Sequence, residues 1–347
     1  MRVVLRADAG FEQGTGHVMR CLTLAEELVN RGHEVHLMVA PIPVPWLRAS
    51  VLDSGLTIHE CAADEIPDDA IRALDTDWLI VDSYRIPAKA ISRINAEVRV
   101  LAIIDGDDRS IDATLYLDQN LGSERISRPL DRTDRYLCGS DYALVRHAVR
   151  SARQDLPWQL PNDEPNVLCF MGGTDPTGSV IGAVRSLSRA AGDIALTVVA
   201  PEIYHERLRL EGAAAPGMKI LPPTRELPML MSQAEVIVSA AGTSAWDICT
   251  LGVPAVLVAV VENQRVSLRE ILNRRLALGI DLTREGGAAI EQTGLLVTRL
   301  IESPALREQL SRASRAAFDG RGCERVVSAL EQRTPSRVDE ANSAIHR

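Results

Sequence analysis

The stretch that decides the fold is residues 1–25, MRVVLRADAGFEQGTGHVMRCLTLA. An apolar strand is predicted at 3–5, a glycine-bearing loop follows at 14–16, and apolar residues then recur at helical spacing over 18–28. Strand, glycine loop and helix in this order present a helix N-terminus and polar side chains at the carboxyl edge of a parallel sheet. A ligand site is therefore predicted at the end of the first strand.

A histidine stands at the mouth of this loop, because His17 directly follows Gly16. An imidazole titrates near neutral pH and is suited to accept a proton. Asp8, at the end of the predicted strand, is positioned to orient the ring. We predict that His17 is a general base supported by Asp8. The alternative left open is that His17 only caps the start of the helix.

The composition indicates a globular protein with an acidic balance. The chain has 347 residues, enough for two domains, of which 46% are hydrophobic and 24% charged. Its formal net charge of -9 argues against a nucleic-acid-binding surface. The six cysteines are scattered without metal-ligand spacing, which favours a reducing compartment. Neither a signal peptide nor an apolar run long enough to span a bilayer is seen, so we predict a cytoplasmic protein without a membrane partner.

Strands and helices alternate in the first half of the chain. Apolar strands are predicted at 34–39, 78–81 and 98–104, separated by helical patterns. This alternation is typical of a parallel sheet with right-handed crossovers. Residues 151–165 are rich in proline and polar groups and lack periodicity, which indicates a linker.

The second half of the chain repeats the pattern. Its predicted strands are 166–171, 195–199, 236–239 and 254–260. We therefore predict an α/β protein with two domains, 1–150 and 166–333, that face each other across a cleft. The tail 334–347 lacks periodicity and is predicted to be disordered.

Two glycine turns follow predicted strands of the second half. They are Gly172, Gly173 and Thr174 in one turn, and Gly242, Thr243 and Ser244 in the other. Glycine lets the backbone approach a diphosphate, and the N–H groups of a helix start stabilise its charge. Each turn alone is equally well explained by a tight connection between strand and helix. The occurrence of two favours a nucleotide site in the second domain.

Polar residues beside these turns are candidate contacts for a nucleotide. Asp247 lies three residues after Ser244, where its carboxylate either accepts hydrogen bonds from ribose hydroxyls or caps the helix. Asn263 and Gln264 follow an apolar strand and either bind a polar ligand or form an ordinary loop.

An acidic turn, Asp105, Asp107 and Asp108, follows the strand predicted at 98–104. A second cluster of ligands is not visible in the sequence, so a polar turn explains these residues better than a metal site. We predict neither a metal nor a cofactor.

These residues together resemble a known family. The chain is similar to the UDP-2,4-diacetamido-2,4,6-trideoxy-β-L-altropyranose hydrolases of pseudaminic acid biosynthesis, whose family includes spore-coat polysaccharide proteins. More distantly, it resembles the bacterial glycosyltransferase that makes lipid II. The matching motifs, spread from residue 1 to about 330, are RAD (6–8), GTGHVMRCLTLA (14–25), DSY (82–84), DQNL (118–121), FMGGTD (170–175), AGTSAWD (241–247), LGVP (251–254), NQ (263–264) and DGRG (319–322).

The resemblance implies a GT-B fold, in which two Rossmann-like domains face each other and the C-terminal one holds the nucleotide. It implies that His17 is the general base acting on water and that Tyr84 lies near the sugar. Asp247 stands where the family usually has a glutamate taken to bind the ribose, and Asn263 and Gln264 would contact the phosphates or the sugar. We further predict that Gly14, Gly16 and Arg20 of the N-terminal motif bind the nucleotide or the substrate.

The predicted activity is hydrolysis of a UDP-linked, N-acylated amino deoxysugar at the anomeric carbon. Water attacks, UDP leaves and the step inverts, because a single base leaves no covalent intermediate. Two alternatives stay open: an inverting UDP-sugar-dependent glycosyltransferase, and a module that binds a nucleotide sugar without turnover. The predicted partner is the small-molecule substrate, and the oligomeric state stays open.

Overall fold

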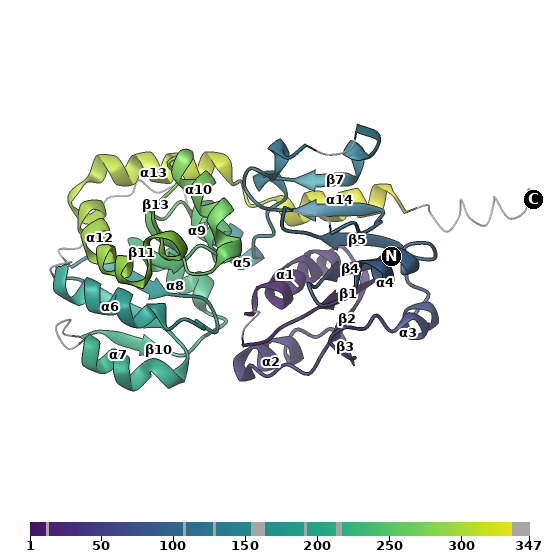
Figure 1. Ribbon diagram of the computed structural model, residues 1–347, viewed down its shortest axis with the longest axis horizontal. Helices are drawn as coiled ribbons and strands as arrows, with labels where there is room; N and C mark the ends of the chain where they lie inside the picture. Colours follow the sequence, from purple (N-terminus) through teal and green to yellow (C-terminus); the bar gives the residue numbers. More distant parts are fainter. Residues whose placement is uncertain are drawn as a thin grey trace, which may run out of the picture.

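Two α/β units lie side by side in the computed structural model (Figure 1). The structure describes residues 1–11, 14–106, 109–127, 130–153, 164–190, 193–212 and 217–334. Most of the predicted linker (154–163) and nearly all of the predicted tail (335–347) therefore lie outside the described residues. Within the described ranges, we find no helix with the length and apolar character needed to cross a bilayer.

The first unit contains a seven-stranded parallel sheet with strand order β3-β2-β1-β4-β5-β6-β7. Its strands are β1 (Arg2–Ala7), β2 (Glu34–Val39), β3 (Thr57–Glu60), β4 (Trp78–Asp82), β5 (Arg99–Ile103), β6 (Leu115–Asp118) and β7 (Tyr136–Cys138). Its α-helices are α1 (Gly16–Asn30), α2 (Pro45–Leu52), α3 (Asp68–Ala73) and α4 (Ala88–Ile94), and its 3₁₀ helices are η1 (Ser123–Arg125), η2 (Leu130–Arg135) and η3 (Ser140–Tyr142).

The second unit contains a six-stranded parallel sheet with strand order β10-β9-β8-β11-β12-β13. Its strands are β8 (Asn166–Phe170), β9 (Ala195–Val199), β10 (Lys219–Leu221), β11 (Val236–Ala240), β12 (Ala255–Ala259) and β13 (Leu278–Asp281). Its helices are α6 (Ser179–Ala190), η4 (Glu202–Tyr204), α7 (His205–Glu211), α8 (Leu227–Gln233), α9 (Ser244–Leu251), η5 (Glu262–Gln264), α10 (Arg265–Asn273), α11 (Leu282–Glu285), η6 (Gly287–Gln292), α12 (Thr293–Glu302) and α13 (Pro304–Ala317).

Each central strand is buried on both faces, which explains why these strands are continuous apolar runs. In β1, Val3 and Leu5 belong to the core layer that also contains Leu24 of α1, whereas Val4 points to the opposite layer. In β11, Val238 and Ile237 likewise belong to two different core layers. Because strand side chains alternate in direction, an uninterrupted apolar run fills both layers.

The chain crosses between the units twice. Each crossing segment packs on the unit other than the domain to which the sequence-based limits assign it. Helix α5 (His147–Ala152) packs on α8 and α9, with Val149 in the core of the second unit. Helix α14 (Gly322–Gln332) packs on α1, with Val326 and Leu330 in the core of the first unit (Figure 1). The domain limits 1–150 and 166–333 therefore need correction at both ends, because these apolar faces are buried across the predicted boundaries.

Each strand order reverses direction once. In the first sheet the chain runs outward from β1 to β3 and returns to β4 on the other side of β1. In the second sheet the same reversal separates β8 from β11. In open α/β sheets, ligands bind in the crevice beyond the carboxyl ends of the strands at such a reversal. His17 follows β1, and the two glycine turns follow β8 and β11.

Candidate functional site

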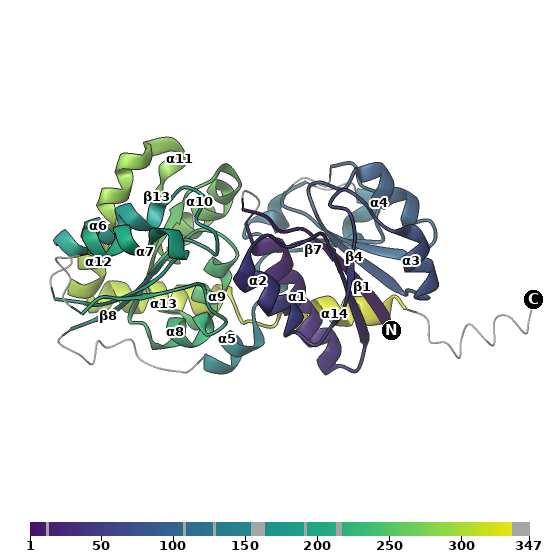
Figure 2. The same cartoon turned by 90° about the horizontal axis from the view of Figure 1, so that it is seen from below.

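A cavity of about 690 Å³ lies between the two units and is lined by residues of both. Figure 2 shows the start of α1 and helix α2 on the side of the first unit that faces the second. Of the predicted catalytic residues, His17 lines the cavity, whereas Asp8 and Tyr84 do not. All predicted binding residues lie on its wall: Gly14, Gly16, Arg20, Gly172, Gly173, Thr174, Gly242, Thr243, Ser244, Asp247, Asn263 and Gln264.

His17 lies in the first turn of α1, and its side chain is 11% exposed. The loop reaches it through Gly14, whose φ of 77° favours glycine. Nδ1 is buried without a hydrogen-bond partner among the described residues and lies 4.0 Å from Oδ1 of Asp82. Nε2 is therefore the ring nitrogen left to meet a ligand in the cavity.

Asp8 does not orient the imidazole, contrary to the sequence-based expectation. Its Oδ1 accepts from Nη1 of Arg6 at 2.7 Å, and its Oδ2 accepts from the hydroxyl of Ser83. These bonds join the ends of β1 and β4, so Asp8 stabilises the scaffold. The carboxylate beside His17 is Asp82, the last residue of β4.

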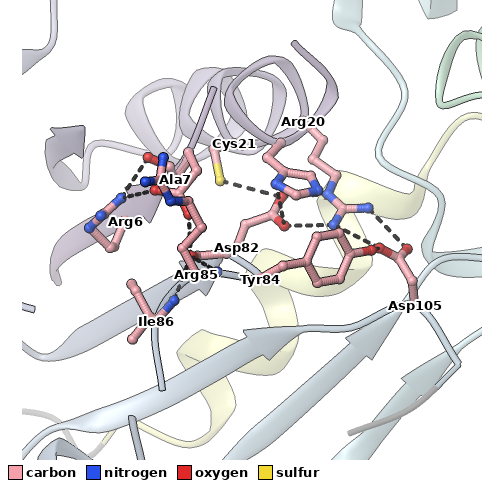
Figure 3. A network of polar contacts seen from close by, with 12 residues as sticks. Arg6, Ala7, Arg20, Cys21, Asp82, Tyr84, Arg85, Ile86 and Asp105 are labelled. Carbon is pink, nitrogen blue, oxygen red and sulfur yellow. Dashed lines mark hydrogen bonds and ion pairs between the residues drawn. The ribbon is translucent and has the colours of Figure 1, made fainter. Parts of the chain in front are cut away.

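Arg20 lies between the carboxylates of Asp82 and Asp105 (Figure 3). It donates to both oxygens of Asp82, with Nη2 2.6 Å from Oδ1, and its Nη1 lies 3.2 Å from Oδ1 of Asp105. Burial alone would lower the pKa of Arg20, but Asp105 and Asp82 raise it well above its ordinary value. Burial likewise opposes ionisation of Asp105, yet Arg20 holds the pKa of this carboxyl far below its usual range. The trio therefore carries one net negative charge beside His17.

Tyr84 joins this network through Asp105 (Figure 3) and also contacts His17. Its hydroxyl donates to Asp105, and its ring meets the His17 ring edge-on, with centroids 4.9 Å apart. Burial and the charge of Asp105 raise the pKa of Tyr84, which keeps the phenol a neutral donor. Tyr84 is 47% exposed, although it is not part of the cavity wall.

Asp105 is the centre of this network. Besides Arg20 and Tyr84, it accepts from Nδ2 of Asn120 at 2.9 Å. Asp107 and Asp108 lie outside the described residues. Within the part of the chain that the structure describes, no group of three or more His, Cys, Asp or Glu side chains has the arrangement of a metal site.

The turn after β8 differs from the expectation, because helix α6 does not offer a free N-terminus. Asp175 accepts from the amides of Ser179 at 3.1 Å and Val180 at 3.0 Å and so occupies the start of α6. A ligand at this turn meets the loop backbone, which Gly172 bends with a φ of 84°.

The turn after β11 leads directly into α9 and leaves its start open. The amides of Ala245 and Trp246 bond back to the carbonyls of Gly242 and Thr243, and the Thr243 side chain makes no cap. The preceding amides have no acceptor within the helix, so they are available to an anion in the cavity.

Asp247 is bound by Arg146, the residue directly before α5. Its Oδ2 accepts from Nη2 of Arg146 at 2.6 Å and from Nε at 2.9 Å, and its Oδ1 accepts from the Arg146 amide at 3.3 Å. Burial raises the pKa of Asp247, and the Arg146 guanidinium opposes this shift. The carboxylate expected to bind a ribose is thus already engaged.

Several contacts close the cleft between the units. Nε1 of Trp46 in α2 donates to the carbonyl of Gly173 at 3.2 Å. Arg225 pairs with Asp53 at 3.0 Å, also bringing α2 against the second unit. Helix α2 therefore contacts both the turn after β8 and the loop before α8.

The chain is similar in sequence to proteins of known name. No family model matches the chain. Its sequence is 25% identical to the spore coat polysaccharide biosynthesis protein SpsG of Bacillus subtilis, over 95% of this chain and 98% of that protein. It is also 32% identical to a UDP-N-acetylglucosamine–N-acetylmuramyl-(pentapeptide) pyrophosphoryl-undecaprenol N-acetylglucosamine transferase of Leuconostoc mesenteroides, over 32% of each chain.

Solved structures match the whole molecule. MurG of Acinetobacter baumannii superposes with a TM-score of 0.64 at 16% identity, over 95% of this chain and 99% of that one. The UDP-GlcNAc 2-epimerase of Neisseria meningitidis bound to UDP-GlcNAc gives 0.62 at 12% identity, over 96% and 100%. The chain has the GT-B fold. The predicted fold class is thereby confirmed.

Five residues of the site were not assigned to it from the sequence: Asp82, Asp105, Asn120, Arg146 and Trp46. The first three have a signal, since each lies at or just after the carboxyl end of a strand in the first sheet. Arg146 and Trp46 have none, because their partners are 101 and 127 residues away in the chain.

Proposed function

We propose that the chain hydrolyses a UDP-linked, N-acylated amino deoxysugar at the anomeric carbon and releases UDP and the free sugar. The observation that carries this proposal is the position of His17 on the cavity wall, on the opposite unit from the open start of α9. A base on one side and an anion site on the other match a reaction in which water attacks as a diphosphate leaves.

A nucleotide sugar is the ligand class that the cavity suits best. The loop after β8 and the start of α9 present backbone N–H groups to a diphosphate. The similarity to a spore coat polysaccharide protein, and the UDP-sugars in the names of a relative and a solved structure, support the same class. Asn263 and Gln264 line the same wall and add side-chain amides for the phosphates or the sugar.

His17 acts on water in this proposal. Its Nε2 takes the proton as the oxygen attacks, and the ring becomes an imidazolium. The net negative charge of Asp82, Arg20 and Asp105 stabilises that cation, since Asp82 lies 4.0 Å from Nδ1. Asp82 is thus a positioning residue for the base, the role first assigned to Asp8.

The departing UDP is stabilised on the second unit. Negative charge grows on its β-phosphate as the bond to the anomeric carbon breaks. Backbone N–H groups at the start of α9 are fixed in place before the reaction and meet this charge without reorganising. We propose that they serve in place of a metal ion, and that the reaction inverts the anomeric centre because water attacks directly.

Glycosyl transfer is the alternative, and the similarity to a sugar transferase favours it. The same base would then remove the proton from an acceptor hydroxyl instead of water. The two reactions differ only in what occupies the space beside His17.

Mass spectrometry of products formed from a panel of UDP-amino sugars in ¹⁸O-labelled water tests the proposal. Hydrolysis predicts free sugar with the label at its anomeric oxygen and UDP without label, with no acceptor present. Label in UDP means that the phosphorus–oxygen bond is cleaved and contradicts the mechanism. UDP release that depends strictly on an added acceptor selects transfer, and tight binding without any product selects a binding module.

A further inference from the structure

The cavity wall contains an arginine whose Nη1 atom makes no hydrogen bond to any described residue. Of the three arginines on this wall, Arg20 is bound to two carboxylates and Arg225 pairs with Asp53 at the surface. Arg146, with a side chain 18% exposed, is bound to Asp247 alone.

The geometry of this pair fixes which atoms face the cavity. Nε and Nη2 of Arg146 both donate to Oδ2 of Asp247, so one edge of the planar guanidinium is fully engaged. Nη1 lies on the opposite edge. Among the described residues it has no hydrogen-bond partner, and it is not one of the buried unpartnered atoms. Its N–H groups are therefore free to donate to a ligand.

Asp247 itself is poorly placed to bind a ribose. Its side chain is 7% exposed, and three donors of Arg146 already reach its two oxygens. A carboxylate offers about four acceptor positions, so two ribose hydroxyls could bind only if bonds to Arg146 break. The pair instead resembles a cation held in one orientation by a buried anion.

The start of α9 is close enough for one ligand to meet both features. Asp247 lies three residues after Ser244, about 4.5 Å further along the helix axis. A phosphate at the open N-terminus of α9 is therefore within the reach of a guanidinium that packs on Asp247. Guanidinium and phosphate form strong charge-assisted hydrogen bonds.

We infer that Arg146 donates to a phosphate oxygen of the bound nucleotide and that Asp247 is its positioning residue rather than a ribose contact. This inference rests on the proposed function, because it takes a nucleoside diphosphate as the ligand. It also makes nucleotide binding a property of both units, since Arg146 lies at the crossing from the first unit to the second.

Calorimetric titration with UDP and with uridine tests the inference, since uridine retains the ribose and lacks the phosphates. Arg146→Gln is expected to weaken UDP binding by roughly ten- to hundredfold and uridine binding by less than about threefold. Arg146→Lys keeps the charge but loses the paired donors, so a smaller loss for UDP is expected. Asp247→Asn is expected, like Arg146→Gln, to weaken UDP binding more than uridine binding. The double variant is expected to bind UDP no more weakly than Arg146→Gln alone. Arg93→Gln, which breaks a surface pair with Asp68, is the control and leaves both affinities unchanged.

Each other outcome overturns the inference. Unchanged UDP binding in folded Arg146→Gln and Arg146→Lys shows that the arginine does not touch the nucleotide. Equal losses for UDP and uridine place its contact on the nucleoside. A larger loss of uridine binding in Asp247→Asn than in Arg146→Gln restores the acid as the ribose ligand. Wild-type protein that binds no UDP overturns the proposed function as well, which separates that failure from the others.

Discussion

At the scale of single residues, the chemistry of the site depends on carboxylates that differ in their partners. Asp82 and Asp105 share Arg20 and lie next to His17 and Tyr84. Asp8, which follows the neighbouring strand β1, is bound to Arg6 and Ser83 and has no part in the cavity wall. Substitution of these acids therefore separates catalysis from folding.

Asp82→Asn is expected to lower kcat by roughly ten- to thousandfold, because the amide no longer stabilises the imidazolium that forms on His17. Asp8→Asn is expected to cost about 3–5 kcal/mol of stability, because it leaves the buried Arg6 guanidinium without its anion. The folded Asp8→Asn fraction should keep its kcat. Steady-state kinetics and urea denaturation of both variants check this pair of predictions, and a loss of kcat confined to Asp8→Asn would contradict it.

Asp105→Asn is expected to reduce stability by roughly 1–3 kcal/mol at pH 7. Because Arg20 depresses the pKa of the Asp105 carboxyl in the folded state, its contribution is present above the unfolded pKa of about 3.9 and is lost as the pH falls below that value. The difference between wild type and variant should therefore shrink between pH 5 and pH 3. Urea denaturation at a series of pH values measures it, and a difference that stays constant or grows would contradict the assignment.

At the scale of elements, the turn after β8 packs directly against the first unit. A Cβ atom on Gly173 would lie 2.4 Å from Cζ2 of Trp46 and 2.7 Å from Oγ1 of Thr15. Glycine is therefore required here by the opposite unit, in addition to any ligand. The turn and helix α2 form one contact across the cleft.

Gly173→Ala is expected to cost about 1–3 kcal/mol through overpacking and to reduce kcat/KM, because Trp46 and Thr15 must move away from the turn. Gly287→Ala is the matched control, since its added methyl group would have no atom within 4 Å. Thermal melting and kinetics of both variants provide the measurement. Equal behaviour of the two variants would mean that the contact is not made in solution.

The elements also show how much of the fold can be predicted from the sequence. All eight predicted strands coincide with observed strands, because buried parallel strands are apolar throughout. Five short strands were missed: β3, β6, β7, β10 and β13. They have three or four residues each, and β3 and β10 lie at sheet edges with partly exposed side chains, so neither length nor burial marks them.

The site was predictable to the extent that its residues follow strands. His17 and both glycine turns were assigned from local pattern, and all of them line the cavity. The partners of His17 and Asp247 were not, because Asp82 and Arg146 are brought to them by the fold. Local pattern marks the loops at a carboxyl edge, but the pairing of charges within them depends on three-dimensional packing.

At the scale of the whole molecule, the proposed reaction requires the two units to separate for a nucleotide to enter and to approach each other for His17 to act. Trp46 of α2 and Asp53, which directly follows α2, bind the second unit. Ser267 of α10 donates to Asn120 of the first unit at 3.3 Å, and Asn120 in turn donates to Asp105. These contacts thus join the second unit to the polar network around Asp105.

Trp46→Ala is expected to favour the open arrangement and to raise KM by roughly two- to tenfold, the range for loss of one hydrogen bond. Small-angle X-ray scattering without UDP should give a larger radius of gyration for Trp46→Ala than for the wild type. With UDP bound, the difference between the two proteins should be smaller. Leu52→Ala on the same helix, an exposed residue outside the cavity wall, is the control. Identical scattering and KM in wild type and Trp46→Ala would exclude this contact as a determinant of closure.

The measurement that tests the account most directly compares turnover with UDP binding in His17→Ala. We predict that turnover of the UDP-sugar falls by at least roughly two orders of magnitude, while the affinity for UDP changes by less than about threefold. In our proposal the base, His17, belongs to the first unit and the open start of α9 belongs to the second, so loss of the imidazole leaves that anion site intact. Turnover that survives, or turnover and UDP binding that are lost together, would contradict the central claim.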